Sequence, residues 1–464
     1  MLDNFKFKKW HFVLIISVLA ALMIVLVLLS TNTKTHDGDE YVTFIKYFAG
    51  VDNIKLFWIH SSIYPLLGSL LVKAYPSIKA VQMLGIAILF LTGALICGFT
   101  RSKKAVMLWA FSPVVWLLGG SIYPAMLGAL LFFAAYILLK KYEGGRGRHM
   151  LLLAGLMLGL SNAVTETSWP YSLFFILIFF YGKQFKDVLQ FAVPAIIGFA
   201  AKLIVDYFIF GYAHFSLLRF LGANFVVFIG GHTENIIYRL SPLNIVVVLF
   251  GISPLLFLAY KGYKKGLKAE SIFIAVSLFF MLFIYTTGLP HHFFSIVPIA
   301  VVLLSKTLSG KQAAISALLS IPLIIYLSMP GISSAWTSSM QSDIAQMQNE
   351  FNYDAVIADR NLELPLAANI WSSRPYVIWL DEYLASKTGN KVLKTYELSE
   401  EPRFNNFKIA RLSFSYIANT AEQYPENLPF LTKINGEAPP LEGYALSKCY
   451  KGICVYEKQP SARD

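Results

Sequence analysis

Long apolar stretches recur along the first 330 residues of this chain, and short polar gaps separate them. About 20 apolar residues suffice for a helix to cross the hydrocarbon core of a bilayer, so these stretches predict transmembrane helices. The pattern therefore indicates an α-helical polytopic membrane protein with about eleven transmembrane helices. We expect them at residues 11–30, 79–99, 104–119, 123–139, 150–164, 169–182, 188–209, 243–260, 270–287, 292–305 and 311–329.

Two of the gaps between these predicted helices are long. The first, residues 31–78, includes the sequence WIHSSIYPLLGSLLVKAYP. It is apolar but too short to cross a bilayer, so we predict a short amphipathic or re-entrant helix there. The second, residues 210–242, is aromatic and apolar with few charges, as is typical of a surface at the membrane interface.

Charge is sparse and unevenly distributed. Only 14% of the residues are charged, whereas soluble domains average about 25%, which excludes an ordinary soluble protein. The net charge of +12 is concentrated in alternate gaps, at residues 6–9, 101–104, 140–148, 183–186, 261–268 and 306–311. Cytoplasmic loops of membrane proteins carry such an excess, so the charge indicates orientation in a cell membrane and not binding to nucleic acid. We expect a cytoplasmic N-terminus and, with an odd number of spans, an extracytoplasmic C-terminal region.

The composition changes near Ser333, which divides the chain into two predicted domains. Residues 1–332 form the transmembrane domain, and residues 333–464 mix helical and strand-like pieces with turn signals at Pro365, Pro375 and Gly389. About 130 residues are enough for a core of their own. We therefore predict a soluble extracytoplasmic α/β domain, with strands in NKVLKTYELSE and in GYALSKCYKGICVYEKQ.

Two cysteines, Cys449 and Cys454, flank the sequence YKGI in this domain. A two-residue turn at Lys451-Gly452 would place them directly opposite each other in an antiparallel hairpin, with Cα atoms about 4.5–5.5 Å apart. We predict a disulfide between them, which would require an oxidising compartment. Two reduced cysteines in the same hairpin are the alternative.

Three carboxylates and a histidine stand together just after the first predicted helix, at His36, Asp37, Asp39 and Glu40. In one interpretation Asp39 caps a helix that begins at Glu40. In another, the cap holds Asp39 at the membrane–water boundary as a general base that takes a proton from a hydroxyl. The two interpretations are compatible. Asp37 and His36 could also help to bind a divalent cation, and we predict no other cofactor.

Short matches to a known family occur at Asp39-Glu40-Tyr41, followed by Tyr64-Pro65-Leu66 in IHSSIYPL. The sequences GLMLGLSNAVTETSWPYSLFFI and LPHHFFSIVPIAVVLL match two further family stretches by position. Over residues 1–330 the chain thus resembles the GT-C superfamily of membrane glycosyltransferases, in its protein O-mannosyltransferase and aminoarabinose transferase-like branch (family 39, RgtA/B/C/D-like). Two positions depart from the family pattern, because Glu166 and His291-His292 stand near places where the family has basic residues.

The resemblance implies an inverting glycosyltransferase that moves a sugar from a polyprenyl-phosphate donor to an acceptor hydroxyl on the outer face of the membrane. The acceptor would be a protein, a lipid or a glycan. Asp39 would be the catalytic base and Glu40 its neighbour that positions the acceptor, with Asp37 and Glu166 as supporting acids. His60 and Tyr64 would belong to the acceptor loop.

The phosphate of such a donor needs cations at interface depth. The candidates on the predicted outer side are Lys46, Lys55, Arg219, His291 and His292. Arg219 could instead extend to lipid headgroups, and the two histidines could simply lie at the interface. Lys202 and Asp206, four residues apart in a predicted span, suit an ion pair within one helix.

Three other functions remain open from the sequence: a multi-pass transporter, a lipid-linked-sugar flippase, and a non-catalytic relative whose outer domain binds a partner. Few charges fall inside the predicted spans and no internal repeat is visible. Transporters commonly carry charged residues within their spans and are built from internal repeats, so the absence of both from this pattern favours the glycosyltransferase.

Overall fold

A computed structural model of the chain describes residues 9–29, 36–50, 60–182, 185–211, 213, 216–217, 253–283 and 294–333, together with five strands beyond them. The chain forms two compact units. The first comprises Met1–Leu29, Gln82–His214 and Ala223–Met329, and the second Ser30–Val81, Phe215–Gly222 and Pro330–Asp464. Each unit is described by itself below.

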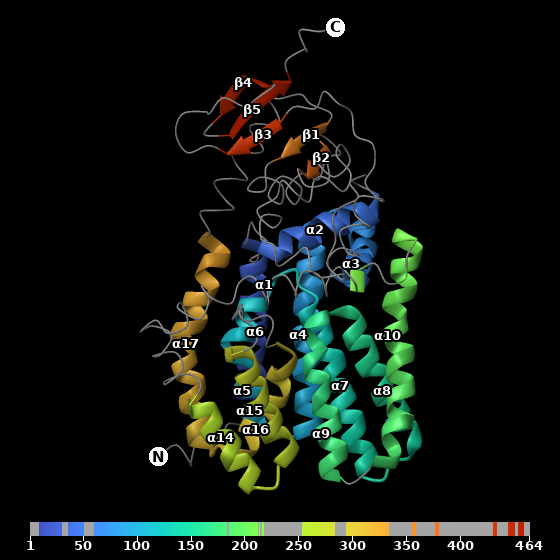
Figure 1. Ribbon diagram of the computed structural model, residues 1–464. Coiled ribbons are helices and arrows are strands. Elements are labelled where there is room, and N and C mark those ends of the chain that lie inside the picture. The colour runs from blue at the N-terminus through green and yellow to red at the C-terminus, as the bar shows by residue number, and fades with distance from the viewer. Residues whose placement is uncertain are drawn as a thin grey trace. The chain divides into compact units, whose positions relative to one another are not determined.

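The first unit is helical (Figure 1). Its helices are α1 (Lys9–Leu29), α4 (Ile78–Thr100), α5 (Lys103–Ala110), α6 (Pro113–Leu118), α7 (Ala125–Glu143), α8 (Arg148–Val164), α9 (Leu173–Gly182), α10 (Val188–Phe210), α14 (Ser253–Lys264), α15 (Lys268–Phe283), α16 (Val297–Thr307) and α17 (Gly310–Ser333). Single 3-10 turns, η2 (Glu166–Ser168), η3 (Pro170–Ser172) and η4 (Phe185–Asp187), connect α8, α9 and α10.

Three of the described helical segments, Ile78–Thr100, Ala125–Glu143 and Phe185–Ile209, are long and apolar enough to cross a membrane. Several shorter apolar helices accompany them. This agrees with the predicted helical membrane protein, and most predicted ranges coincide with a helix to within a few residues. The number of about eleven crossings remains a prediction.

One predicted span, residues 104–119, is wrong as a single helix. The chain leaves the helical conformation at Ser112, whose ψ is 122°, and α6 begins at Pro113. Proline disfavours a helical conformation in the residue before it and has no N–H to continue the helix. The indole N–H of Trp116 donates to the carbonyl of Ala110 at 2.7 Å. This bond provides a partner for a carbonyl group at the end of α5, where the helical ladder stops.

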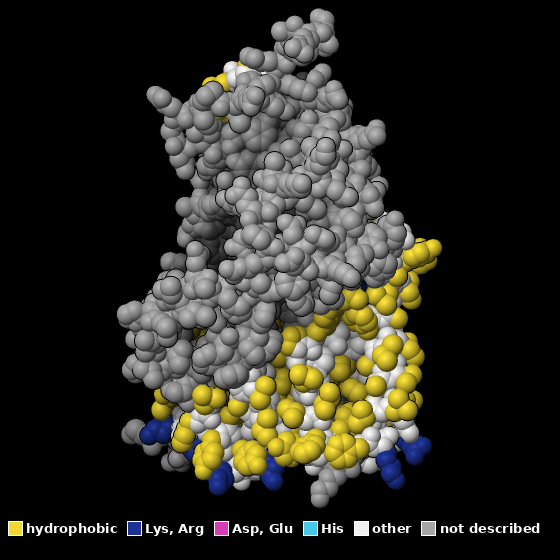
Figure 2. Space-filling model, in the orientation of Figure 1, with side chains coloured by type: hydrophobic (Ala, Val, Ile, Leu, Met, Phe, Trp, Pro, Cys, Tyr) yellow, Lys and Arg dark blue, Asp and Glu magenta, His cyan; other side chains and the backbone are white. Residues whose placement is uncertain are grey.

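The basic turns of the first unit lie at one end of it, and side-chain contacts join them. Lys104, in the first turn of α5, and Lys265, in the α14–α15 turn, donate to the carbonyls of Leu308 and Lys306 at the end of α16, at 2.8 and 3.0 Å. Lys140 of α7 pairs with Glu270 of α15 at 3.4 Å. Figure 2 shows lysine and arginine side chains at this end, next to a mostly hydrophobic surface.

Helices α8 and α10 touch backbone to backbone at glycines. A Cβ atom added to Gly159 would overlap the carbonyl oxygen of Ala195, and one added to Gly155 would overlap that of Phe191. A Cβ atom on Gly198 of α10 would lie 2.6 Å from the carbonyl oxygen of Leu156. Small residues at such positions let helices approach closely in an apolar environment, where van der Waals packing holds them together.

The second unit contains helices α2 (His36–Ala49) and α3 (Ile63–Ala74) and the strands β1 (Ala355–Ala358), β2 (Tyr376–Trp379), β3 (Phe430–Lys433), β4 (Tyr444–Tyr450) and β5 (Ile453–Lys458). The strands form one sheet in the order β2-β1-β3-β5-β4. The first three strands run parallel, and β5 pairs antiparallel with both β3 and β4. Residues 390–400, also predicted as a strand, lie outside the described part of the chain.

The predicted β4–β5 hairpin is confirmed. Its register pairs Cys449 with Cys454 and Tyr450 with Ile453, so the connecting turn has the two residues that the sequence indicated. The cysteine side chains are outside the described part, and the disulfide between them stays a prediction.

The glycine contact gives a stability prediction. We expect Gly159→Leu to lower the unfolding temperature in detergent, because the new side chain overlaps the backbone of α10 and overpacking alone costs about 1–3 kcal/mol. Gly98→Leu in α4 is the matched control, since a Cβ atom there meets nothing within 4 Å. Equal unfolding temperatures for the two variants would contradict the backbone contact.

The hairpin register gives a second prediction. In full-length protein purified without reductant, we expect Cys97 to react with an alkylating reagent once the protein is unfolded. Cys449 and Cys454 should react only after reduction, because their register suits a disulfide. In the Cys454→Ser variant, Cys449 should become reactive without reductant. Alkylation of all three cysteines in the unreduced wild type, measured by peptide mass spectrometry, would refute the bond.

Candidate functional site

The predicted catalytic acids lie in the first turns of α2. This helix begins at His36, so Asp37, Asp39 and Glu40 are its second, fourth and fifth residues. The backbone N–H groups at a helix N-terminus are unpaired within the helix and carry partial positive charge, which favours carboxylates there. The side chains of these four residues are outside the described part of the structure. Their roles as base, supporting acids and metal ligands therefore remain predictions.

The prediction that Asp39 caps a helix starting at Glu40 is wrong. The helix starts about one turn earlier, at His36, so Asp39 is inside it and not at the flanking cap position. Asp39 is consequently fixed by helical backbone on both sides. A rigid backbone at this residue is what a precisely aimed general base requires.

An aromatic cluster joins α2 to α3 directly after the acids. Tyr41 stacks on His60, with ring centroids 5.6 Å apart and an interplanar angle of 30°. The ring of Tyr64 meets Tyr41 edge-on at 6.1 Å and 87°. Both tyrosines are buried and His60 is half-buried. The structure thus brings together His60 and Tyr64, both predicted for the acceptor loop, beside the residue that follows Glu40.

A close helix contact supports this aromatic cluster. A Cβ atom on Gly68 of α3 would lie 2.8 Å from Cδ1 of Ile45 in α2, so the two helices pack tightly one turn beyond Tyr41. Ser61 and Ser62, which precede α3, are buried, and the hydroxyl of Ser61 accepts from the N–H of Ile63 at 3.3 Å. The segment from His60 into α3 is therefore held by the ring of Tyr41 and by the packing of α3 against α2.

Lys46 is the predicted phosphate ligand that the structure describes. It lies in the last turn of α2 and is only 1% exposed. Residues 39 and 46 are seven apart, which places their Cα atoms on the same side of the helix and about 10.5 Å apart along its axis. Lysine is almost never buried this fully without an anionic or hydrogen-bonding partner, so Lys46 acts inside the protein and not as a surface cation.

The first unit contains a separate buried ion pair. Lys202 Nζ of α10 lies 2.5 Å from Glu166 Oε1 of η2, and the two residues are 0% and 2% exposed. Asp206, one turn further along α10, is also buried. The predicted ion pair within α10 is thus replaced by one between α10 and the turn after α8. Glu166, predicted as a supporting acid, is buried in this ion pair.

A network of hydroxyl groups surrounds the turn that carries Glu166. The Ser168 hydroxyl lies 3.2 Å from that of Ser161 and 3.1 Å from that of Ser295, and Ser161 donates to the carbonyl of Gly128 at 2.8 Å. The indole N–H of Trp169 donates to the carbonyl of Asn162 at 2.7 Å. These bonds connect the turn to α7, to α8 and to the segment before α16, so Glu166 is held rigidly.

The remaining predicted ligands, Lys55, Arg219, His291 and His292, lie outside the described residues. Their proposed contact with a donor phosphate stays a prediction. Among the described residues, no three or more His, Cys, Asp or Glu side chains are grouped as a metal site would need. The suggested cation ligands, His36 and Asp37, have side chains outside that search.

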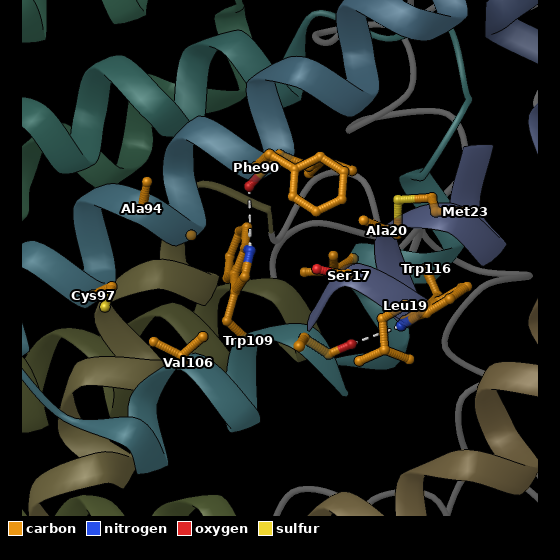
Figure 3. A pocket seen from close by; sticks show the side chains of 14 residues that line it. Ser17, Leu19, Ala20, Met23, Phe90, Ala94, Cys97, Val106, Trp109 and Trp116 are labelled. Carbon is orange, nitrogen blue, oxygen red and sulfur yellow. Dashed lines mark hydrogen bonds between the residues drawn. The ribbon is translucent and has the colours of Figure 1, made fainter. Parts of the chain in front are cut away.

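Sequence reasoning missed an apolar pocket within the first unit. Residues of α1, α4, α5 and α6 line a cavity of about 370 Å³, with Trp109 and Trp116 in its wall (Figure 3). The signal that could have found it was Ser112-Pro113 within an otherwise continuous apolar run, because a broken helix in an apolar unit often borders a cavity.

No protein-family model, curated protein or solved structure matches this chain.

The buried ion pair gives a third prediction. Lys202→Met leaves the Glu166 carboxylate buried without its cation, and we expect a loss of about 3–5 kcal/mol in the free energy of unfolding. Adding Glu166→Gln should recover much of that loss, because neither buried charge then remains. Lys186→Met, at an exposed lysine in η4, is the control and should change stability little. Denaturant unfolding in detergent measures the stability of the Lys202→Met variant, the double variant and the control. If the effects of Lys202→Met and Glu166→Gln were additive, the pairing would be contradicted.

Proposed function

We propose that this protein is a multi-pass membrane glycosyltransferase of the GT-C type. It transfers a sugar, with inversion, from a polyprenyl-phosphate donor to an acceptor hydroxyl outside the cytoplasm. In this proposal the basic end of the first unit faces the cytoplasm, as the positive-inside rule requires.

The observation that carries the proposal is the acidic start of α2 beside the aromatic cluster of Tyr41, His60 and Tyr64. The chain supplies a carboxylate-rich helix N-terminus. The half-buried ring of His60, stacked on the buried Tyr41, is held beside the same helix and can meet an acceptor. This combination suits a site that deprotonates a hydroxyl while it holds a sugar-like acceptor.

The chemistry needs one base and a good leaving group. Asp39 takes the proton from the acceptor hydroxyl, and the acceptor oxygen then attacks the anomeric carbon of the donor sugar. The bond between that carbon and the phosphate oxygen breaks, and polyprenyl phosphate departs with the electron pair. Attack opposite the leaving phosphate inverts the anomeric configuration. Glu40 would position the acceptor, and Asp37 would support the pair.

The departing phosphate carries negative charge that cations stabilise. Lys46 is proposed for this part because it is a buried cation on the helix that carries the acids. Lys55, Arg219, His291 and His292 are further candidates from the sequence alone. Glu166 is assigned a structural part, since it already neutralises Lys202.

A fourth prediction tests the assigned base. In membranes that contain the protein, we expect Asp39→Asn to lower sugar transfer from polyprenyl-phosphate donors by about 10²- to 10⁴-fold, the usual contribution of a general base. Asp187→Asn is the matched control, because Asp187 lies at the basic end of the first unit, where its carboxylate accepts from the hydroxyl of Tyr142. Mass spectrometry of surface glycans, with and without the gene, would identify the sugar to assay. Transfer by Asp39→Asn at the wild-type rate would refute Asp39 as the base.

One observation favours a second candidate, a transporter. Glu166, Lys202 and Asp206 are buried ionisable groups in an apolar helical unit, and such groups often mark ion or proton pathways in membranes. Solute uptake into proteoliposomes by the wild type, lost in Asp206→Asn and accompanied by no sugar transfer, would support the transporter and exclude the glycosyltransferase.

A further inference from the structure

Close contacts between helices form the walls of the apolar pocket in the first unit. It lies where α4 meets the broken segment α5–α6, and α1 closes it on a further side (Figure 3). Gly93 makes room for the indole of Trp109, because a Cβ atom there would lie 2.9 Å from Cδ1 and Nε1 of that ring. Met23 of α1 packs similarly against Gly119, which follows α6, with Sδ 3.0 Å from the position of an added Cβ.

The pocket lining presents hydrocarbon and almost no polar group. The two indole N–H groups in its wall are already used, since Trp109 donates to the carbonyl of Leu89 at 3.3 Å and Trp116 to that of Ala110 at 2.7 Å. The pocket-lining residues include no acidic or basic side chain. A ligand with charges or many hydroxyl groups would lose its hydration there without compensation. The chemistry therefore fits a hydrocarbon chain.

The pocket is continuous with the apolar outer surface of the unit. Phe90, Ala94 and Cys97 belong to its lining and are also exposed, and the adjacent side chains of Leu91 on α4 and Leu22 on α1 are about half exposed. Side chains of this kind face lipid tails in a helical membrane protein. An acyl chain can enter from the bilayer without leaving an apolar environment.

We propose that this pocket holds one acyl chain of a bilayer phospholipid as a bound lipid. The chain lies against Trp109 and Trp116 and fills the space left by the break between α5 and α6. Without it, the pocket walls would lose packing contacts on one side. This inference is independent of the proposed glycosyltransferase activity, because it uses only residues of the first unit.

The test replaces a small pocket-lining residue with a larger one that occupies the cavity. Ala94→Phe places an aromatic ring in the cavity, and Ala87→Phe on the same helix is the matched control, since Ala87 is exposed and does not line the pocket. Full-length wild type and both variants are extracted in mild detergent, and bound lipids are counted by native mass spectrometry. We expect Ala94→Phe to lose one phospholipid per chain relative to the other two proteins. Ala20→Phe, from the α1 wall, serves if Ala94→Phe does not fold.

A second measurement locates the lipid. Two of the chain's 8 tryptophans line the pocket, and brominated acyl chains quench tryptophan fluorescence at contact. In bilayers of brominated phosphatidylcholine, we expect less quenching for Ala94→Phe than for wild type or Ala87→Phe. Equal lipid counts and equal quenching in all three proteins would overturn the proposal. Loss of a polyprenyl phosphate, with phospholipid unchanged, would also overturn it and assign the pocket to an isoprenoid chain.

Discussion

Polar groups inside the helical unit have to find their partners within the protein, because an apolar surrounding offers none. This requirement is visible at several places where the helices are interrupted or carry a polar side chain. Trp116 bonds the carbonyl at the end of α5, Gln82 donates to the carbonyl of Gly120 at 2.8 Å, and Ser161 donates to that of Gly128. The buried Glu166–Lys202 pair meets the same requirement for charges. Helix packing in this unit is arranged around such bonds.

Basic and acidic side chains occupy opposite kinds of helix terminus in this chain. At the basic end, Lys104 and Lys265 donate to carbonyls at the C-terminus of α16, where the helix dipole favours positive charge. Both ammonium groups remain at least partly accessible to water. In the acidic turn of α2, carboxylates occupy the opposite kind of helix end, where negative charge is favoured. The sequence therefore places each sign of charge where its helix terminus stabilises it.

Features that depend on neighbouring residues could be predicted from the sequence. Apolar runs gave most helix positions, and the spacing of Cys449 and Cys454 gave the hairpin register, since both follow from local geometry. Features that join distant segments could not. The partner of Lys202 is 36 positions away in the turn after α8, and no pattern links the two. The apolar pocket could not be predicted either, because its walls come from four helices, α1, α4, α5 and α6, whose packing the sequence pattern does not specify. The break at Ser112 was predictable in principle, but the apolar run around it concealed the signal of Pro113.

The glycine contact between α8 and α10 has a mechanical consequence. With backbones touching at Gly155, Gly159 and Gly198, the two helices cannot slide past or rotate about each other without steric overlap, so they behave as one rigid body. Any rearrangement of this unit during a working cycle must then be taken up elsewhere.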